Sequence, residues 1–159
     1  MIAPRASAAS GYTVLELVVT AAVLSIVAGV AVVALRPAER IADLRTAVCD
    51  TANTVRMKAS SAARGSTEHV TAADIRSGDK LVVNPRDFGP PGAVVATEFA
   101  LQGGTGTAYC RGVRAVVAIV IADAGDPTQA LAVVAGTAGR VEILRYDPKG
   151  HRWEADGDG

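Results

Sequence analysis

The sequence predicts an α+β protein: one long N-terminal helix, half membrane-spanning and half amphipathic, packed on a C-terminal antiparallel β-sheet of four to six strands. Three observations predict this class. Residues 17–35 carry no charge. Apolar residues then recur at three- and four-residue steps to about residue 64. From residue 80 onward, short apolar segments alternate with breakers rich in Gly, Pro and Asp.

The uncharged run consists of Val, Ala, Leu and Ile, interrupted only by Thr20, Ser25 and Gly29. As a helix it would be about 28 Å long, close to the hydrocarbon thickness of a bilayer. Glu16 stands immediately before it. A carboxylate at the edge of such a segment is costly to desolvate, which makes Glu16 a candidate functional residue.

Three interpretations of the N-terminus remain open on these residues alone. A secretory signal peptide has an apolar core of about 7–15 residues, shorter than this run, although the small residues at 28–34 would permit cleavage. A plain membrane anchor explains the length and leaves Glu16 as an interfacial residue. In the third interpretation, processing occurs before the apolar run, at Gly11, so that the anchor survives cleavage.

Residues 11–16 read GYTVLE, and the uncharged run follows them directly. This combination resembles the prepilin cleavage and methylation signal of type IV pilins and type II secretion pseudopilins. The resemblance implies that a prepilin peptidase cuts after Gly11 and methylates the new N-terminus at Tyr12. It also implies that Glu16, the fifth mature residue, attracts the N-terminus of a neighbouring subunit during assembly, because an opposite charge offsets much of the cost of a carboxylate in lipid. The alternative is that Glu16 reaches the headgroups and pairs with its own N-terminus.

The resulting organisation is a prepilin leader at 1–11, a transmembrane and assembly helix at 12–35, an amphipathic continuation at 36–65 and a β-rich domain at 66–159. Arg5, the single cation of the leader, favours its retention in the cytoplasm. The C-terminal domain would then lie on the extracytoplasmic side of the inner membrane. The partners that the resemblance implies are other pilin or pseudopilin subunits, the prepilin peptidase, the inner-membrane assembly platform and membrane lipid.

The amphipathic half carries one apolar stripe, and Pro37 is expected to bend the helix near its start. Gly65 is expected to end it. The stripe comprises Ile41, Leu44, Val48, Ala52, Val55, Ala59 and Ala62.

Thr71 and Asp74 form a capping-box pattern that predicts a short helical turn to about Ser77. Strands are predicted beyond it, and short connections favour antiparallel pairing. The segment 113–122 is almost wholly apolar, which predicts a central strand covered on one face by the helix. The predicted strands are 80–84, 93–101, 107–110, 113–122, 129–135 and 140–146.

The segment 129–146, QALAVVAGTAGRVEILRY, resembles the minor pseudopilin group often called the type II secretion H subunit or the FimT-like pilus assembly proteins. DNA-capturing relatives are expected to carry extra cations near its turn. Here Glu142 alternates with Arg140, the tail from Glu154 is acidic and the net charge is zero. Nucleic-acid binding is therefore disfavoured, although DNA uptake stays an alternative beside type II secretion and the type IV pilus. A membrane-anchored binding module that never polymerises is the competing class.

Other chemistries have little support in the sequence. The acidic segments 123–126 and 154–159 offer oxygen ligands for Ca²⁺, but they lack the spacing of an EF-hand loop and read as turns. His69 and His151 are single and polar in context, which predicts surface positions. The Gly-rich segment 103–110 lacks the Lys of a phosphate loop. We expect no enzymatic activity, metal or cofactor.

Cys49 and Cys110 are the only cysteines, and they have no zinc-ligand spacing. Cys49 lies beside the helical stripe, and Cys110 ends a predicted strand. If the domain is exported, a disulfide between them would join helix to sheet and contribute about 3–5 kcal/mol. The alternative is two small buried residues that never meet.

Overall fold

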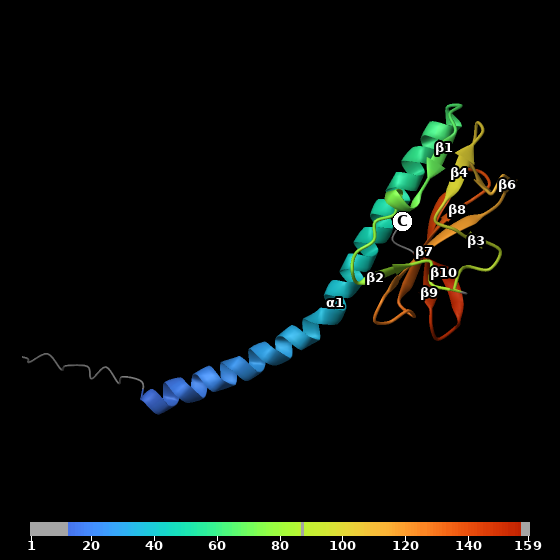
Figure 1. Ribbon diagram of the computed structural model, residues 1–159. Helices are drawn as coiled ribbons and strands as arrows, with labels where there is room; N and C mark the ends of the chain where they lie inside the picture. The colour runs from blue at the N-terminus through green and yellow to red at the C-terminus, as the bar shows by residue number, and fades with distance from the viewer. Residues whose placement is uncertain (1–12, 87, 157–159) are drawn as a thin grey trace, which may run out of the picture. The chain divides into compact units, whose positions relative to one another are not determined.

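The computed structural model describes residues 13–86 and 88–156. The chain divides into an N-terminal unit that ends at Ala38 and a C-terminal unit that begins at Glu39. Helix α1 (Val14–Ala63) continues through Pro37 and belongs to both units. All the strands belong to the C-terminal unit (Figure 1). The predicted α+β class, with the helix packed on antiparallel sheets, is confirmed.

In the C-terminal unit, α1 buries the stripe that its periodicity predicts. The exception among the predicted members is Ile41, which is 43% exposed. Gly65 has φ +104° and follows the last helical residue by two positions, in the left-handed conformation that a glycine tolerates at a helix end. The buried residues of the helix are Leu44, Ala47, Val48, Thr51, Ala52, Val55, Ala59 and Ala62.

In the part of the chain that the structure describes, ten strands form two sheets. The first sheet has four antiparallel strands in the order β1-β4-β5-β6. The second has the order β10-β9-β8-β7-β2, also antiparallel, with β3 pairing in parallel with β7. The bounds in the first sheet are β1 (Glu68–Val70), β4 (Phe99–Gln102), β5 (Thr107–Cys110) and β6 (Val113–Arg114). Those in the second are β2 (Leu81–Val83), β3 (Val94–Val95), β7 (Val117–Asp123), β8 (Ala130–Ala135), β9 (Val141–Asp147) and β10 (Arg152–Ala155).

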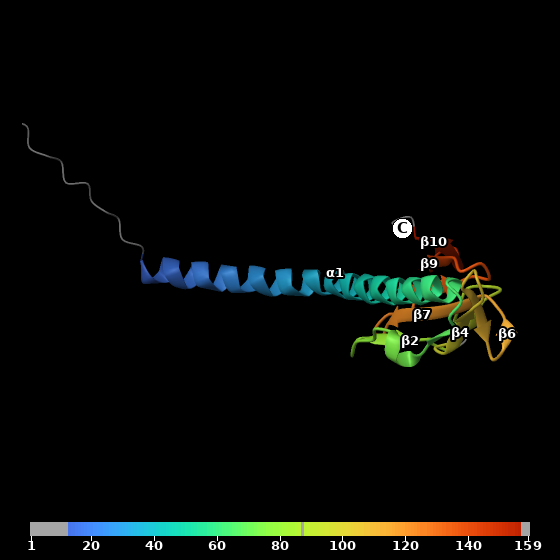
Figure 2. The same ribbon diagram turned by 90° about the horizontal axis from the view of Figure 1, so that it is seen from above.

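Strand β7 is the centre of the fold, and all of its residues are buried. Figure 2 shows it running beside the C-terminal part of α1. Its Val117, Ile119 and Ile121 share one core with the helical stripe. Its Val120 and Ala122 lie in a second core on the opposite face of the sheet. The helix therefore covers one face, as expected, but the other face is covered as well.

An aromatic cluster closes that second core. The ring centroids of Phe88 and Tyr146 are 4.6 Å apart in an edge-on arrangement, and Trp153 lies 5.3 Å from Phe88 and 5.4 Å from Tyr146. Aromatic pairs favour such tilted contacts. The loop that carries Phe88 thus packs against strands β9 and β10.

A glycine permits a close approach between the helix and the first sheet. Gly106 lies in the turn between β4 and β5 with φ +65°, and a Cβ there would sit 2.5 Å from the carbonyl oxygen of Ala59. A side chain at this position would meet backbone rather than a movable side chain. The turn therefore fixes the first sheet against α1.

The strand boundaries differ from those predicted in two ways. The predicted strands 93–101 and 113–122 are each divided, because the chain crosses between sheets at residues 96–98 and again at 115–116. Strands β1 and β10 were not predicted. The capping-box turn does form, as a short 3₁₀ helix, η1 (Ala72–Asp74), that ends before Ser77.

Candidate functional site

The first turn of α1 holds Glu16, the candidate assembly residue. Its backbone N–H donates to Thr13 Oγ1 at 3.2 Å, and Leu17 N–H donates to the Thr13 carbonyl at 3.2 Å. A carboxylate in a first turn is favoured by the partial positive charge of the helix N-terminus. Within residues 13–86 and 88–156, the Glu16 carboxylate has no hydrogen-bond or ion-pair partner. Any group that pairs with this carboxylate must therefore come from outside the described residues.

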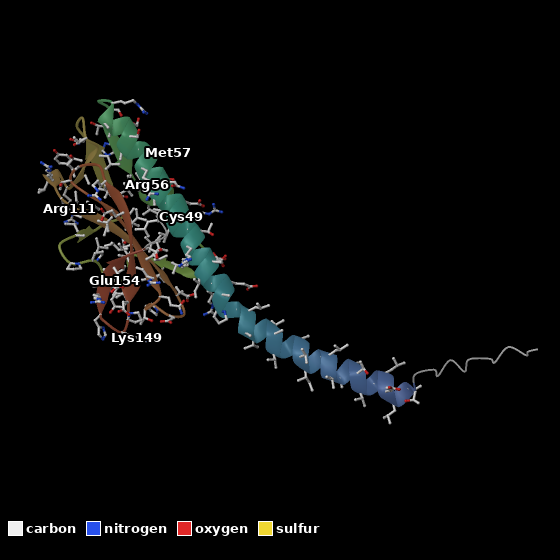
Figure 3. The ribbon with its side chains drawn as sticks, turned by 180° about the vertical axis from the view of Figure 1, so that it is seen from behind. Cys49, Arg56, Met57, Arg111, Lys149 and Glu154 are labelled. Carbon is white, nitrogen blue, oxygen red and sulfur yellow. The ribbon has the colours of Figure 1, made fainter. Side chains whose placement is uncertain are left out.

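The helix that follows is long and apolar enough to cross a membrane, with a mean hydropathy of 2.7 in its most apolar window. None of that window is buried. The side chains project outward along the N-terminal part of α1 (Figure 3). The large apolar residues exposed on this part are Val14, Leu15, Leu17, Val18, Val19, Val23, Leu24, Ile26, Val27, Val30, Val32, Val33 and Leu35.

The two hydroxyls in this segment are satisfied by the helix itself. Thr20 Oγ1 donates to the Glu16 carbonyl at 2.7 Å, and Ser25 Oγ donates to the Ala21 carbonyl at 2.8 Å. In hydrocarbon an unpaired donor costs several kcal/mol. Neither side chain therefore needs a partner from lipid or from another helix.

Gly11 and Tyr12, the predicted cleavage and methylation residues, lie outside the described residues. Processing after Gly11 therefore stays a prediction.

An ion pair connects α1 to the segment between β1 and β2. Lys58 Nζ donates to Asp74 Oδ2 at 2.6 Å and to the His69 carbonyl at 2.7 Å. Partial burial acts to raise the pKa of Asp74, but the hydrogen bonds from Lys58 and Thr71 and the Lys58 charge outweigh it. The pKa of Asp74 is consequently lowered. A second pair, Arg76 Nη1 with Asp50 Oδ2 at 2.6 Å, holds the same segment.

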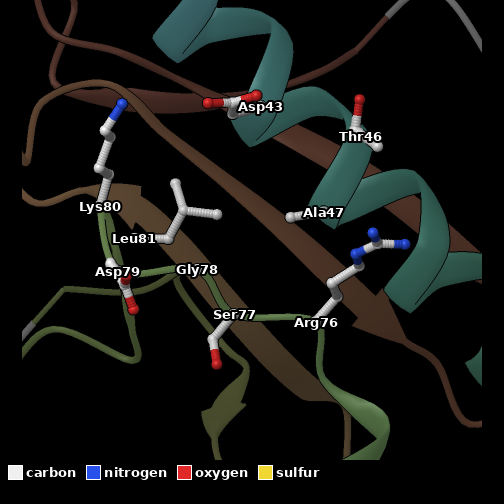
Figure 4. A pocket seen from close by; sticks show the side chains of 9 residues that line it. All are labelled: Asp43, Thr46, Ala47, Arg76, Ser77, Gly78, Asp79, Lys80 and Leu81. Atoms are coloured by element: carbon white, nitrogen blue, oxygen red, sulfur yellow. The ribbon is translucent and has the colours of Figure 1, made fainter.

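A polar pocket of about 350 Å³ opens between α1 and residues 76–81. Asp43 and Asp79 are its two carboxylates, and Figure 4 shows Asp43 on α1 and Asp79 on the facing segment, directed away from the helix. Arg76 is already paired with Asp50. The pocket therefore brings together neither a carboxylate pair nor a histidine with a carboxylate, and its geometry suggests no acid–base chemistry.

A groove of about 410 Å³ opens on the helix-facing side of the second sheet. Its walls come from α1, from the β7–β8 turn with the start of β8, and from the end of β9. It is lined by Ile41, Leu44, Arg45, Thr128, Gln129, Ala130, Leu131, Arg145, Tyr146, Asp147 and Pro148. Sequence analysis missed this groove, although Arg145 follows Ile143 at the two-residue spacing of the sheet's core-facing side.

The predicted disulfide is not formed. Cys49 and Cys110 are both free thiols, and Cys49 is exposed (Figure 3). A helix turns about 100° per residue, so the position after the fully buried Val48 points away from the core. Cys110 packs against the edge of the core that contains the helical stripe. The expectation that Cys49 faces the sheet was wrong, and so was the alternative that both cysteines are buried.

The acidic turn at residues 123–126 uses its carboxylates on its own backbone. Asp123 Oδ1 accepts from the N–H groups of Gly125 at 2.6 Å and Asp126 at 3.1 Å. Hydrogen bonds from Thr128 and Gln129 lower the pKa of Asp126. Among the described residues, no group of three or more His, Cys, Asp or Glu side chains could hold a metal. The backbone hydrogen bonds of Asp123 support the turn interpretation.

The remaining candidates lie at the surface. His69 and His151 are exposed, as predicted, and His151 Nδ1 is 3.1 Å from the Tyr146 hydroxyl. Arg140 and Glu142 form an ion pair of 2.9 Å. Arg140, which follows the turn before β9, is thus paired with a carboxylate, whereas Arg114 donates to the Thr137 carbonyl in that turn at 3.0 Å.

Comparison of the chain with protein-family models, with curated proteins and with solved structures finds no match. The functional argument therefore rests on the residues and geometry described above.

Proposed function

We propose that this chain is a minor pilin or pseudopilin: a single-pass inner-membrane subunit that is processed after Gly11 and assembles into a filament. The filament would be a type II secretion pseudopilus or a type IV pilus. The C-terminal unit would lie on the extracytoplasmic side. The chain would act by assembly with other subunits and not by catalysis.

The observation that carries the proposal is the isolated carboxylate of Glu16 at the start of an apolar, unburied helix. Glu16 is the one ionisable side chain between residues 13 and 35. The hydroxyls of Thr20 and Ser25 are satisfied within the helix, so they provide no partner for its carboxylate. Pairing with the N-terminal amine of a neighbouring subunit would offset the cost of its desolvation. The same pairing would define the axial register between subunits.

Processing can be tested by co-expressing the full chain with a prepilin peptidase. The expected result is loss of residues 1–11 and one added methyl group at Tyr12, both measured by intact mass. Gly11→Val should leave the chain in the membrane but uncleaved. A chain that keeps its leader with the active peptidase, or loses it equally well as Gly11→Val, contradicts the proposal.

Assembly is tested separately with Glu16→Gln, which removes the charge and keeps the shape. Insertion and cleavage should be unchanged, whereas incorporation into sheared filaments should fall strongly. Glu39→Gln, on the same helix but beyond the apolar run, is the matched control and should incorporate normally. Normal incorporation of Glu16→Gln would mean that the carboxylate is merely interfacial and would favour an anchored binding module.

A DNA-uptake role is the weaker form of the proposal. Arg140 is paired with Glu142, which reduces the positive potential that phosphate binding requires. In a gel-shift assay at low salt, we expect the purified chain not to bind DNA.

A further inference from the structure

The groove between α1 and the second sheet is the place where the apolar stripe of the helix is left uncovered. Leu44 is 4% exposed, whereas Ile41, one turn earlier on the same stripe, is 43% exposed. Leu131, Ala130 and Pro148 continue the apolar lining on the side of the sheet. The groove thus offers an apolar floor that the described residues do not fill.

Two arginines stand on its opposite walls. Arg45 comes from α1, and Arg145 comes from β9. Arg145 is paired in register with Leu131, so a guanidinium is placed beside the apolar lining. The Arg145 side chain is exposed and has no hydrogen bond or ion pair with any described residue. Guanidinium groups bind phosphate through two parallel hydrogen bonds, which an ammonium group does not match.

The carboxylate among the lining residues, Asp147, is already engaged. Asp147 accepts hydrogen bonds from the backbone N–H groups of Lys149 and Gly150, both at 3.0 Å. Its oxygens close the turn between β9 and β10. It therefore competes only weakly for Arg145. Glu154, the register partner of Arg145 on β10, is paired with Arg152 at 2.7 Å, so the groove retains a site for an anion.

The position of the groove along the chain restricts what can enter it. Ile41 lies six positions after Leu35, the last residue of the uncharged run, so even a fully extended chain between them spans no more than about 22 Å. If residues 17–35 cross a bilayer, as the proposed function requires, the groove lies within reach of lipid headgroups. A ligand with a phosphate and an apolar body is then present at high local concentration.

We propose that this groove binds an anionic phospholipid, with its phosphate on Arg145 and its glycerol and upper acyl region along Ile41 and Leu131. The inference rests on the proposed function only for the presence of the chain in a membrane. Bound lipid would cover the uncovered end of the stripe. Juxtamembrane cations attract anionic lipid in general, and the groove adds a defined place for one molecule.

The test uses the full-length chain in nanodiscs of phosphatidylcholine that contain a minor fraction of phosphatidylglycerol. After transfer to mild detergent, native mass spectrometry counts the retained lipids and identifies them by mass. The wild-type chain should retain phosphatidylglycerol well beyond its share of the bilayer. Arg145→Gln should reduce this preference about fivefold. Arg145→Lys, which keeps the charge but not the fork, should recover part of it.

Arg140→Gln is the matched control, because Arg140 immediately precedes the same strand and the change in net charge is identical. Its lipid preference should equal that of the wild type. Ile41→Ser should lower the retention of both lipids. The far-ultraviolet circular dichroism and melting temperature of each variant verify that it is folded.

Several results would overturn the inference. Equal losses in Arg145→Gln and Arg140→Gln would indicate general surface charge, and no loss in Arg145→Gln would exclude the groove. Displacement of the lipid by inorganic phosphate alone would identify a free anion as the occupant, and a dimer that excludes lipid would identify a second copy. Failure to enter the bilayer at all would refute the membrane anchor, whereas entry without lipid preference would refute only this inference.

Discussion

Val48 is fully buried on the inner face of α1, and the next residue, Cys49, is exposed. Val48→Ala removes two carbon atoms from the core shared by helix and sheet. At about 0.8 kcal/mol per buried carbon the transfer term is about 1.6 kcal/mol, and incomplete collapse of the cavity raises the expected loss to about 2–3 kcal/mol. Cys49→Ala changes an exposed side chain and should alter the free energy of unfolding by less than about 0.5 kcal/mol.

The assay is urea unfolding of the full chain in detergent micelles, followed by the fluorescence of Trp153. This residue is the only tryptophan, and it lies in the aromatic cluster on the far face of the second sheet. It therefore reports on the whole C-terminal unit rather than on the mutated site. Equal losses for the two variants, or no loss for Val48→Ala, would refute the assignment of the buried stripe.

Three further predictions concern the C-terminal unit. Because the pKa of Asp74 is lowered in the folded state, its contribution to stability is fully present above the ordinary aspartate pKa of about 3.9 and is lost as the pH falls through the folded-state value. Lys58→Met should flatten this part of the stability–pH curve, measured by urea titration at each pH; an unchanged curve would contradict the ion pair. Gly106→Ala should cost about 1–3 kcal/mol in the same assay, because the position combines φ +65° with a backbone contact, and full stability would contradict that contact. Cys49 should react with maleimide faster than Cys110, and reductant should leave the melting temperature unchanged. A lower melting temperature in reductant would show that the two cysteines do form a disulfide.

The helix and most strands could be predicted from the sequence because burial there follows a simple period. The apolar stripe from Leu44 to Ala62 repeats at helical spacing, and Gly65 ends it. The segments that became β5, β8 and β9 lie between Gly-rich or acidic turns, so their limits were visible within a few residues. In these places local pattern and tertiary structure agree.

The division into two sheets could not be read from the local pattern. Ala115 and Val116 are as apolar as their neighbours, yet the chain passes there from β6 in one sheet to β7 in the other. Strand β6 pairs with β5, whereas β7 pairs with β8 and also with β2 and β3, which are distant in sequence, and a local pattern does not reveal these partners. Likewise β10 stands in an acidic tail that resembles a solvated end, and only Trp153 signalled a buried face there.

The candidate site divides in the same way. Glu16 was identified because its charge contrasts with everything after it, and its position needs only helical geometry. Cys49 is one 100° step around the helix from the buried Val48. The apolar pattern shows where the stripe lies, but it does not show whether a residue at the edge of the stripe faces the sheet or solvent. Arg145 was overlooked because it lines a groove only together with residues of α1, and the pattern of its own strand does not reveal that groove.

The internal hydrogen bonds of Thr20 and Ser25 have a consequence for how the N-terminal helix distinguishes one neighbour from another. With both hydroxyls returned to their own backbone, the surface from Leu17 to Leu35 offers no directional contact. Rotation of this helix about its axis, or exchange of one apolar surrounding for another, breaks no polar bond. Any preference of this surface for one neighbouring helix over another must then come from shape. The charged side chain next to it is Glu16, at its beginning.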